Sequence, residues 1–214
     1  MWYLNDMNNL AEQLIFEDKG GKNLHLEHIE DEILNYGVDG GRASINFVRS
    51  LRDMFAGATR SSINMTVKWD GAPAIFAGID PEDNKFFVGK KSVFNVEPQL
   101  YKTNADIDKY TSGDLNAKFK VALREFPKLG IKGVLQGDLM FTDDVSTTSI
   151  DGKKYYTFQP NTIVYAVDVD SDFGRQVKSA KIGVVWHTTY TGSDLQSMKA
   201  SFGVNITGLK KTKS

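Results

Sequence analysis

The amino-acid sequence predicts an α+β protein in which N-terminal helices precede a mixed, mostly antiparallel β core. Two observations support this class. Apolar residues recur at helical spacing up to about residue 57, and beyond residue 63 they alternate singly or form short runs between turn residues. No repeat or low-complexity linker interrupts the later part. We therefore expect a helical segment at 1–57 that packs on one core at 58–214.

Three helices are expected in the N-terminal segment. The first contains the apolar residues between 4 and 15, and the second those between 26 and 34. The third covers about 42–55, with Gly57 as its stop, because glycine is common just past a helix end. The glycine-rich stretch 37–41 separates the second helix from the third.

The core begins with a strand pattern. From Ile63 to Asp70 apolar and polar residues alternate, which predicts a half-buried strand whose polar face ends in Lys68 and Asp70. Strands at 74–78 and 86–88 flank the turn residues 80–84, as in a hairpin. The later elements expected are a helix at 115–126, strands near 133–141, 155–158, 162–168 and 181–187, and a short helix capped by Ser193 and Gln196.

Composition limits the chemistry that is available. The 214 residues include no cysteine, which excludes disulfides, thiol catalysis and thiolate zinc sites. Carboxylates and three histidines remain as strong metal ligands, which favours a hard ion such as Mg²⁺. The net charge of −1 means that any nucleic acid must bind a local basic patch. There is no apolar run of about 18 residues and no cationic leader, so we expect a cytoplasmic protein.

Lys68 is the main candidate for chemistry. A free lysine has a pKa near 10.4, so its amine is almost fully protonated at neutral pH. Burial and a neighbouring cation lower the pKa of such an amine by about 2 to 4 units and make it nucleophilic. Gly71 follows closely and lets the backbone approach a ligand. We therefore expect Lys68 to act as a nucleophile.

The run Lys68, Trp69, Asp70, Gly71 resembles the Lys-x-Asp-Gly signature of the covalent nucleotidyltransferases, which are ATP-dependent DNA ligases, RNA ligases and messenger-RNA capping enzymes. The resemblance implies a nucleotidyltransferase core of the ATP-grasp-like ligase adenylation type. It also implies ATP and Mg²⁺ as cofactors and a lysyl-AMP at Lys68. Asp70 would be the second catalytic residue, with Val67 and Gly71 beside the nucleotide.

Two later segments resemble further motifs of these enzymes. The run 87–92 places Lys90 and Lys91 where the family has a basic residue next to the nucleotide. The run 135–139 resembles the Gly-Glu motif, which makes Asp138 the carboxylate that handles ribose or metal.

A third segment, 164–168, resembles the strand whose aromatic ring stacks on the base. The resemblance assigns that stacking to Tyr165. It gives Asp168 the role of a second metal ligand beside Asp138.

The final motifs depart from the family pattern. The run 181–185 resembles the Glu-Gly-x-Val strand, and Lys181 is expected near the nucleotide, but Ile182 stands where the metal-binding glutamate should be. The run 209–213 resembles the closing Lys-x-Lys motif at the very end of the chain, so we expect that the chain is truncated. Pro73 replaces an arginine of the DNA ligases, which favours RNA over DNA.

A second resemblance covers about 23–213 and is to a family of tailed-bacteriophage proteins. It implies an enzyme that works in the cytoplasm of a bacterial host.

Three functions follow as hypotheses. The first is an ATP-dependent polynucleotide ligase or adenylyltransferase that prefers RNA and passes AMP to a 5′-phosphate end, with GTP open as the nucleotide. The second is a catalytically incomplete, ligase-like phage protein that binds nucleotide or nucleic acid. The third is a structural phage protein in which Lys68 only packs.

Each site residue also has a structural alternative. Lys68 and Asp70 would be exposed strand residues, Lys90 and Lys91 a solvated hairpin end, Asp138 a satisfied buried carboxylate and Tyr165 a core residue. His25 and His28 belong to an acidic helix that we expect to be solvated, and His187 has no evident partner in the sequence.

Overall fold

The computed structural model describes residues 29–57 and 69–210. The chain divides into two compact units, Met1–Val67 and Lys68–Ser214. The helix expected at 4–15 and most of the strand expected from Ile63 lie outside the described residues.

The described part of the first unit is helix α2, Ile29–Phe55. Gly37 interrupts it with φ 59° and ψ −128°, so two helical stretches meet at a kink. Ser44 donates a hydrogen bond to the carbonyl of Ile29 (3.0 Å), and a Cβ on Gly40 would lie 1.9 Å from the Glu32 carbonyl oxygen. The predicted break at the glycine-rich stretch is confirmed, and only glycine permits this close packing.

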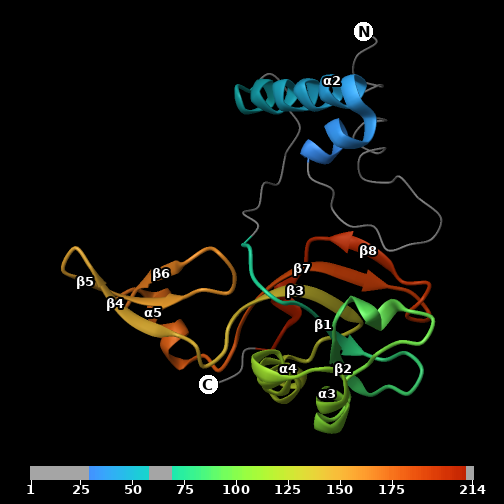
Figure 1. The fold of residues 1–214 in the computed structure, drawn as a ribbon, viewed down its shortest axis with the longest axis vertical. Coiled ribbons are helices and arrows are strands. Elements are labelled where there is room, and N and C mark those ends of the chain that lie inside the picture. Colours follow the sequence, from blue (N-terminus) through green and yellow to red (C-terminus); the bar gives the residue numbers. More distant parts are fainter. Residues whose placement is uncertain (1–28, 58–68, 211–214) are drawn as a thin grey trace. The chain divides into compact units, whose positions relative to one another are not determined.

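The second unit is built on a five-stranded sheet with the order β2-β1-β3-β7-β8 (Figure 1). Every described pairing is antiparallel. The α+β class is therefore confirmed. The strands are β1 (Ala74–Ile79), β2 (Phe86–Gly89), β3 (Val134–Phe141), β7 (Gly183–Thr191) and β8 (Lys199–Phe202).

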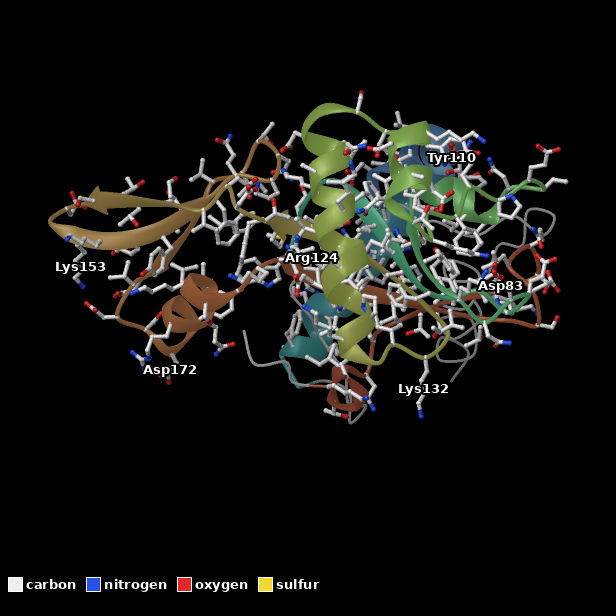
Figure 2. The ribbon with its side chains drawn as sticks, turned by 90° about the horizontal axis from the view of Figure 1, so that it is seen from below. Asp83, Tyr110, Arg124, Lys132, Lys153 and Asp172 are labelled. Atoms are coloured by element: carbon white, nitrogen blue, oxygen red, sulfur yellow. The ribbon has the colours of Figure 1, made fainter. Side chains whose placement is uncertain are left out.

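A three-stranded antiparallel sheet, β4-β5-β6, follows β3. Its strands are β4 (Ser146–Ile150), β5 (Lys153–Phe158) and β6 (Tyr165–Asp168), and helix α5 (Asp172–Ser179) comes next in the chain. Lys153 lies at the turn end of the β4–β5 hairpin, and Asp172 at the start of α5 (Figure 2). All of β4 is exposed.

Helices cover one face of the five-stranded sheet. Helices α3 (Asn104–Tyr110) and α4 (Gly113–Glu125) bury Ile107 and Phe119 against Ile75 of β1 and Leu139 of β3 (Figure 1). These four side chains are at most 1% exposed. The strand residues that alternate with Ile75 and Leu139 consequently face the opposite side of the sheet.

The opposite face carries a second cluster, which includes Phe76, Val134 and Tyr190. The short helix η1 (Lys91–Phe94) packs there through Val93 and Phe94. A third cluster joins Met140 of β3 to residues of the smaller sheet and α5. Its buried members are Met140, Phe141, Phe158, Val167 and Val177.

Several predicted elements are confirmed with small shifts of their ends, namely the β1–β2 hairpin, helix α4 and strands β3, β5, β6 and β7. The predicted helix at Ser193 is wrong. Residues there form a turn, because the Asp194 carboxylate accepts hydrogen bonds from the Ser197 amide (2.8 Å) and hydroxyl (2.6 Å). The sequence did not indicate β4, β8, α3, α5 or the short helices η1, η2 (Phe126–Leu129) and η3 (Ile206–Gly208). Among the described residues, no helix has both the length and the apolar character needed to cross a lipid bilayer.

The turn of the β1–β2 hairpin depends on a buried ion pair. Lys102 donates to the Asp80 carboxylate (2.6 Å) and to Asp83 (2.9 Å), and the Asp80 side chain is only 3% exposed. Burial acts to lower the pKa of Lys102, but these hydrogen bonds outweigh it and hold the pKa above its usual value.

We predict that Lys102→Met lowers the free energy of unfolding by about 3 kcal/mol, because the buried Asp80 carboxylate loses its cation. Lys85→Met is the control, since the Lys85 side chain is 71% exposed and lies 3.5 Å from Asp83; it should change stability by less than about 0.5 kcal/mol. Because folding raises the pKa of Lys102, its contribution to the free energy of unfolding is complete below pH 10.5. It is lost as the pH rises through the raised pKa of the folded protein. Urea unfolding measures both variants, and equal losses would contradict the assignment.

A second prediction contrasts two buried tyrosines. Tyr101 is fully buried, and its hydroxyl has no hydrogen-bond partner within the described ranges. The Tyr190 hydroxyl donates to Gln136 (2.7 Å). Tyr101→Phe should therefore be neutral or stabilising by up to about 1 kcal/mol, whereas Tyr190→Phe should cost about 1 kcal/mol. Thermal unfolding of both variants checks the sign of the difference.

Candidate functional site

Lys68 and Val67 lie outside the described residues, so the site is defined by the residues that follow Lys68. These are Trp69, Asp70 and Gly71, and each contacts a segment that is distant in sequence.

Asp70 is bound by the loop before β6 and by β6 itself. The Tyr165 hydroxyl donates to the Asp70 carbonyl (2.8 Å) and accepts from the Asp70 amide (3.0 Å). The side-chain amide of Asn161 donates to the same carbonyl (3.2 Å) and to the Asp70 carboxylate (2.7 Å). Trp69 stacks on the Tyr165 ring, with 5.3 Å between ring centroids. The residues after Lys68 are thus fixed to the smaller sheet.

Gly71 lies directly against β3. A Cβ at this position would be 2.5 Å from the Leu139 carbonyl oxygen and 2.9 Å from the Asp138 Cβ. The Ala72 amide donates to the Leu139 carbonyl (3.0 Å), and the Leu139 amide donates to the Pro73 carbonyl (3.1 Å). Gly71 and the segment around Asp138 therefore pack together without room for a side chain at residue 71.

Asp138 is buried in β3 and is 6% exposed. It is two residues from Gln136 and four from Val134, so it faces the side of the sheet that α3 and α4 leave uncovered. On this face, burial raises the pKa of Tyr190 to about 12, so its hydroxyl keeps the proton that it donates to Gln136. The face therefore carries polar groups beside an aromatic cluster.

His187 is the residue whose position the sequence did not reveal. Its Nε2 atom lies 3.6 Å from Oδ1 of Asp138, and its Nδ1 atom lies 2.8 Å from the Thr188 hydroxyl. Gln136 pairs with Thr188 while Gly137 pairs with Trp186, so His187 is the extra residue of a β-bulge. Bulges redirect side chains and are common next to active sites.

Lys90 and Lys91 lie at the start of η1. Lys90 is half-buried and precedes the helix, and Lys91 is exposed in its first position. The helix holds Phe94 in contact with the rings of Phe76 and Tyr190, at centroid distances of 5.3 Å and 4.6 Å. Both lysines are thereby attached to the face that carries Asp138.

The remaining candidates are more dispersed. Asp168 is exposed at the end of β6, where it accepts a hydrogen bond from the Asp170 amide (2.9 Å). Lys181 is exposed just before β7. Ile182 packs against the helix-covered core, on the side away from Asp138. Within the described ranges, no group of three or more histidine, aspartate or glutamate side chains is arranged to hold a metal ion.

Tyr165 has protein partners for its ring as well as for its hydroxyl. It stacks on Trp69 and also on Phe158, at 5.6 Å between centroids. A base that stacked on Tyr165 would join this aromatic group.

Residues 23–214 match the Family of unknown function (DUF6267). The chain belongs to this family. No curated protein and no solved structure matches the chain.

Asn161, Tyr190 and His187 were missed as site residues. The signal for Asn161 is its position in the turn that leads into Tyr165, since asparagine side chains often bond to nearby backbone. Nothing in the sequence marks the bulge at His187.

We predict that Gly71→Ala lowers the free energy of unfolding by about 1 to 3 kcal/mol, because the new methyl group collides with the β3 backbone. Gly208→Ala is the control, since a Cβ there would meet nothing within 4 Å. Urea unfolding should separate the two variants. An unaffected Gly71→Ala protein would show that the segment does not lie against β3.

Proposed function

We propose that the protein is an ATP-dependent nucleotidyltransferase that forms a covalent lysyl-AMP at Lys68. The observation that supports it most is the convergence of separate motifs on residues 69–71. Asp70 is bound by Tyr165, and Gly71 lies against Asp138. The segments that resemble the nucleotide-binding motifs of ligases are far apart in sequence, and a chance match of short motifs gives no reason for them to meet.

The proposed reaction transfers AMP to the lysine. The unprotonated Nζ of Lys68 attacks the α-phosphorus of ATP in line, and a nitrogen–phosphorus bond forms. The bond from the α-phosphorus to the bridging oxygen breaks, and pyrophosphate leaves with the electron pair. The amine releases its proton to solvent. Positioning and charge neutralisation supply most of the catalysis in such transfers.

The described residues have definable roles in this proposal. Gly71 brings backbone close to β3, so a nucleotide beside it would meet main-chain atoms and Asp138. Lys90 and Lys91 belong to the same face of the sheet and supply positive charge for phosphates. Tyr165 is proposed to stack on the base, and Lys181 to contact the nucleotide.

Mg²⁺ is the proposed metal, and it would offset negative charge on the phosphates. The buried Asp138 carboxylate fits it, because carboxylate oxygens are the ligands that Mg²⁺ prefers. Asp168 is the other proposed ligand, from the smaller sheet.

Transfer of AMP from Lys68 to a nucleic-acid 5′-phosphate is the proposed second step. We propose RNA over DNA as the acceptor because Pro73 occupies the place of the DNA ligases' arginine. A tailed-bacteriophage origin and a bacterial cytoplasmic location are proposed from sequence resemblance alone.

One observation favours binding without turnover as the second candidate function. Ile182 occupies the place of the metal-binding glutamate and packs against the helix-covered core. A nucleotide-binding protein that lacks this carboxylate would still show ATP-dependent stabilisation, but it would not carry a covalent nucleotide.

The test is incubation of the full chain with α-labelled ATP and Mg²⁺, followed by a denaturing gel and intact-mass spectrometry. We predict a mass increase of one AMP on the wild type and none on Lys68→Ala or Lys68→Arg, because neither variant has an amine that can attack. Lys132→Ala is the control, since Lys132 is an exposed lysine (Figure 2), and it should label like the wild type.

Equal labelling of Lys68→Ala would contradict the assignment of the nucleophile. No label on the wild type, together with a rise in melting temperature with ATP, would leave the binding function in its place.

A further inference from the structure

The strongest unexplained feature of the core is the contact between His187 and Asp138. His187 is placed by a β-bulge in β7, which turns its imidazole toward the same face as Asp138. Without the bulge, the residues paired with Gln136 and Gly137 would be consecutive in β7, and no extra side chain would stand at the position of His187. The bulge therefore brings an imidazole to a buried carboxylate.

The contact is neither a hydrogen bond nor an exposed ion pair. Nε2 of His187 is buried and has no hydrogen-bond partner within residues 29–57 and 69–210. Its separation from Oδ1 of Asp138 is 3.6 Å, which is too long for a hydrogen bond. A buried polar atom without a partner is costly and needs an explanation.

The separation fits two ligands of one metal ion. Ligand nitrogen and oxygen atoms lie about 2.1 Å from a divalent ion, so two neighbouring ligands at angles of about 90 to 120° are about 3.0 to 3.6 Å apart. The distance of 3.6 Å between Nε2 of His187 and Oδ1 of Asp138 is at the upper end of this range. We propose that Nε2 of His187 and Oδ1 of Asp138 together bind a divalent cation.

The Thr188 hydroxyl orients the imidazole for this role. When Nδ1 carries the ring proton, it donates to Oγ1 of Thr188 at 2.8 Å, and Nε2 keeps its lone pair. Metal-binding histidines commonly have such a partner on the other ring nitrogen. The side chains of His187 and Asp138 are 20% and 9% exposed, so an ion bound between them would have little contact with bulk water through these two ligands.

The donor set selects the kind of ion. One imidazole and one carboxylate leave most of the coordination sphere to water or phosphate oxygens. Mn²⁺ suits this set, because it accepts carboxylate, water and phosphate oxygens readily and binds nitrogen ligands more strongly than Mg²⁺ does.

The meaning of the site for catalysis rests on the proposed function. In the proposed AMP transfer, the ion would neutralise nucleotide phosphates close to Gly71. His187 of β7 would then serve as the metal ligand that Ile182 cannot be. The metal site itself does not depend on AMP transfer.

The experiment uses the full chain with Mn²⁺ alone as the probe. Mn²⁺ binding is titrated by electron paramagnetic resonance, and the bound ion is examined for coupling to a ¹⁴N nucleus. We expect one bound Mn²⁺ with a nitrogen coupling in the wild type. His187→Gln and Asp138→Asn should each weaken binding by at least about tenfold, and His187→Gln should abolish the coupling.

Asp151→Asn is the matched control, because Asp151 is exposed in a turn with φ 49°, which asparagine also adopts. It should bind Mn²⁺ like the wild type. Absence of bound Mn²⁺ or of nitrogen coupling in the wild type would overturn the proposal, and so would unchanged binding in a folded His187→Gln protein.

The Mn²⁺ titration and the AMP-labelling experiment together distinguish failure of the metal-site proposal from failure of the proposed function. A nitrogen-coupled Mn²⁺ without any AMP on Lys68 supports the metal site and rejects the nucleotidyltransferase. AMP on Lys68 without nitrogen coupling rejects the metal site and keeps the nucleotidyltransferase.

Discussion

The close approach of Gly71 to β3 is the constraint on which the candidate site depends. The Ala72 amide and the Pro73 carbonyl extend the hydrogen bonding of β3, and the missing Cβ at residue 71 lets the backbone reach Leu139 and Asp138. β1 begins immediately afterwards, at Ala74. Formation of the β1–β3 pairing therefore brings the residues that follow Lys68 to Asp138, so the order of the strands and the position of the site have one cause.

The two faces of the five-stranded sheet differ in the side chains that they carry. The face covered by α3 and α4 holds the large apolar cluster. The other face holds aromatic rings together with Gln136, Asp138 and His187. Because side chains alternate along β3 and β7, the same strands supply both faces. Because of this division, Ile182 packs on the apolar face, whereas His187 reaches Asp138 on the other face.

Sequence patterns predicted the elements with a strong apolar period and missed those without one. β4 consists of Ser146, Thr147, Thr148, Ser149 and Ile150, all exposed, so it has no alternation to detect. α5 and β8 are short, and α5 contains a glycine. α3 has a detectable signal, since Thr103 and Asp106 form a capping box. The motif residues Asp70, Asp138 and Tyr165 could be chosen from the sequence, but the bulge that positions His187 depends on strand register, which no local pattern specifies.

The way in which Asp70 is held separates its attachment from its chemistry. Of the four described hydrogen bonds that join residue 70 to Tyr165 and Asn161, three involve its main-chain amide or carbonyl, and one involves its carboxylate. Main-chain atoms are the same for every residue type except proline, so this anchor would tolerate many substitutions at position 70. An alanine at position 70 would keep the three main-chain bonds and lose the one that the Asn161 amide donates to the carboxylate.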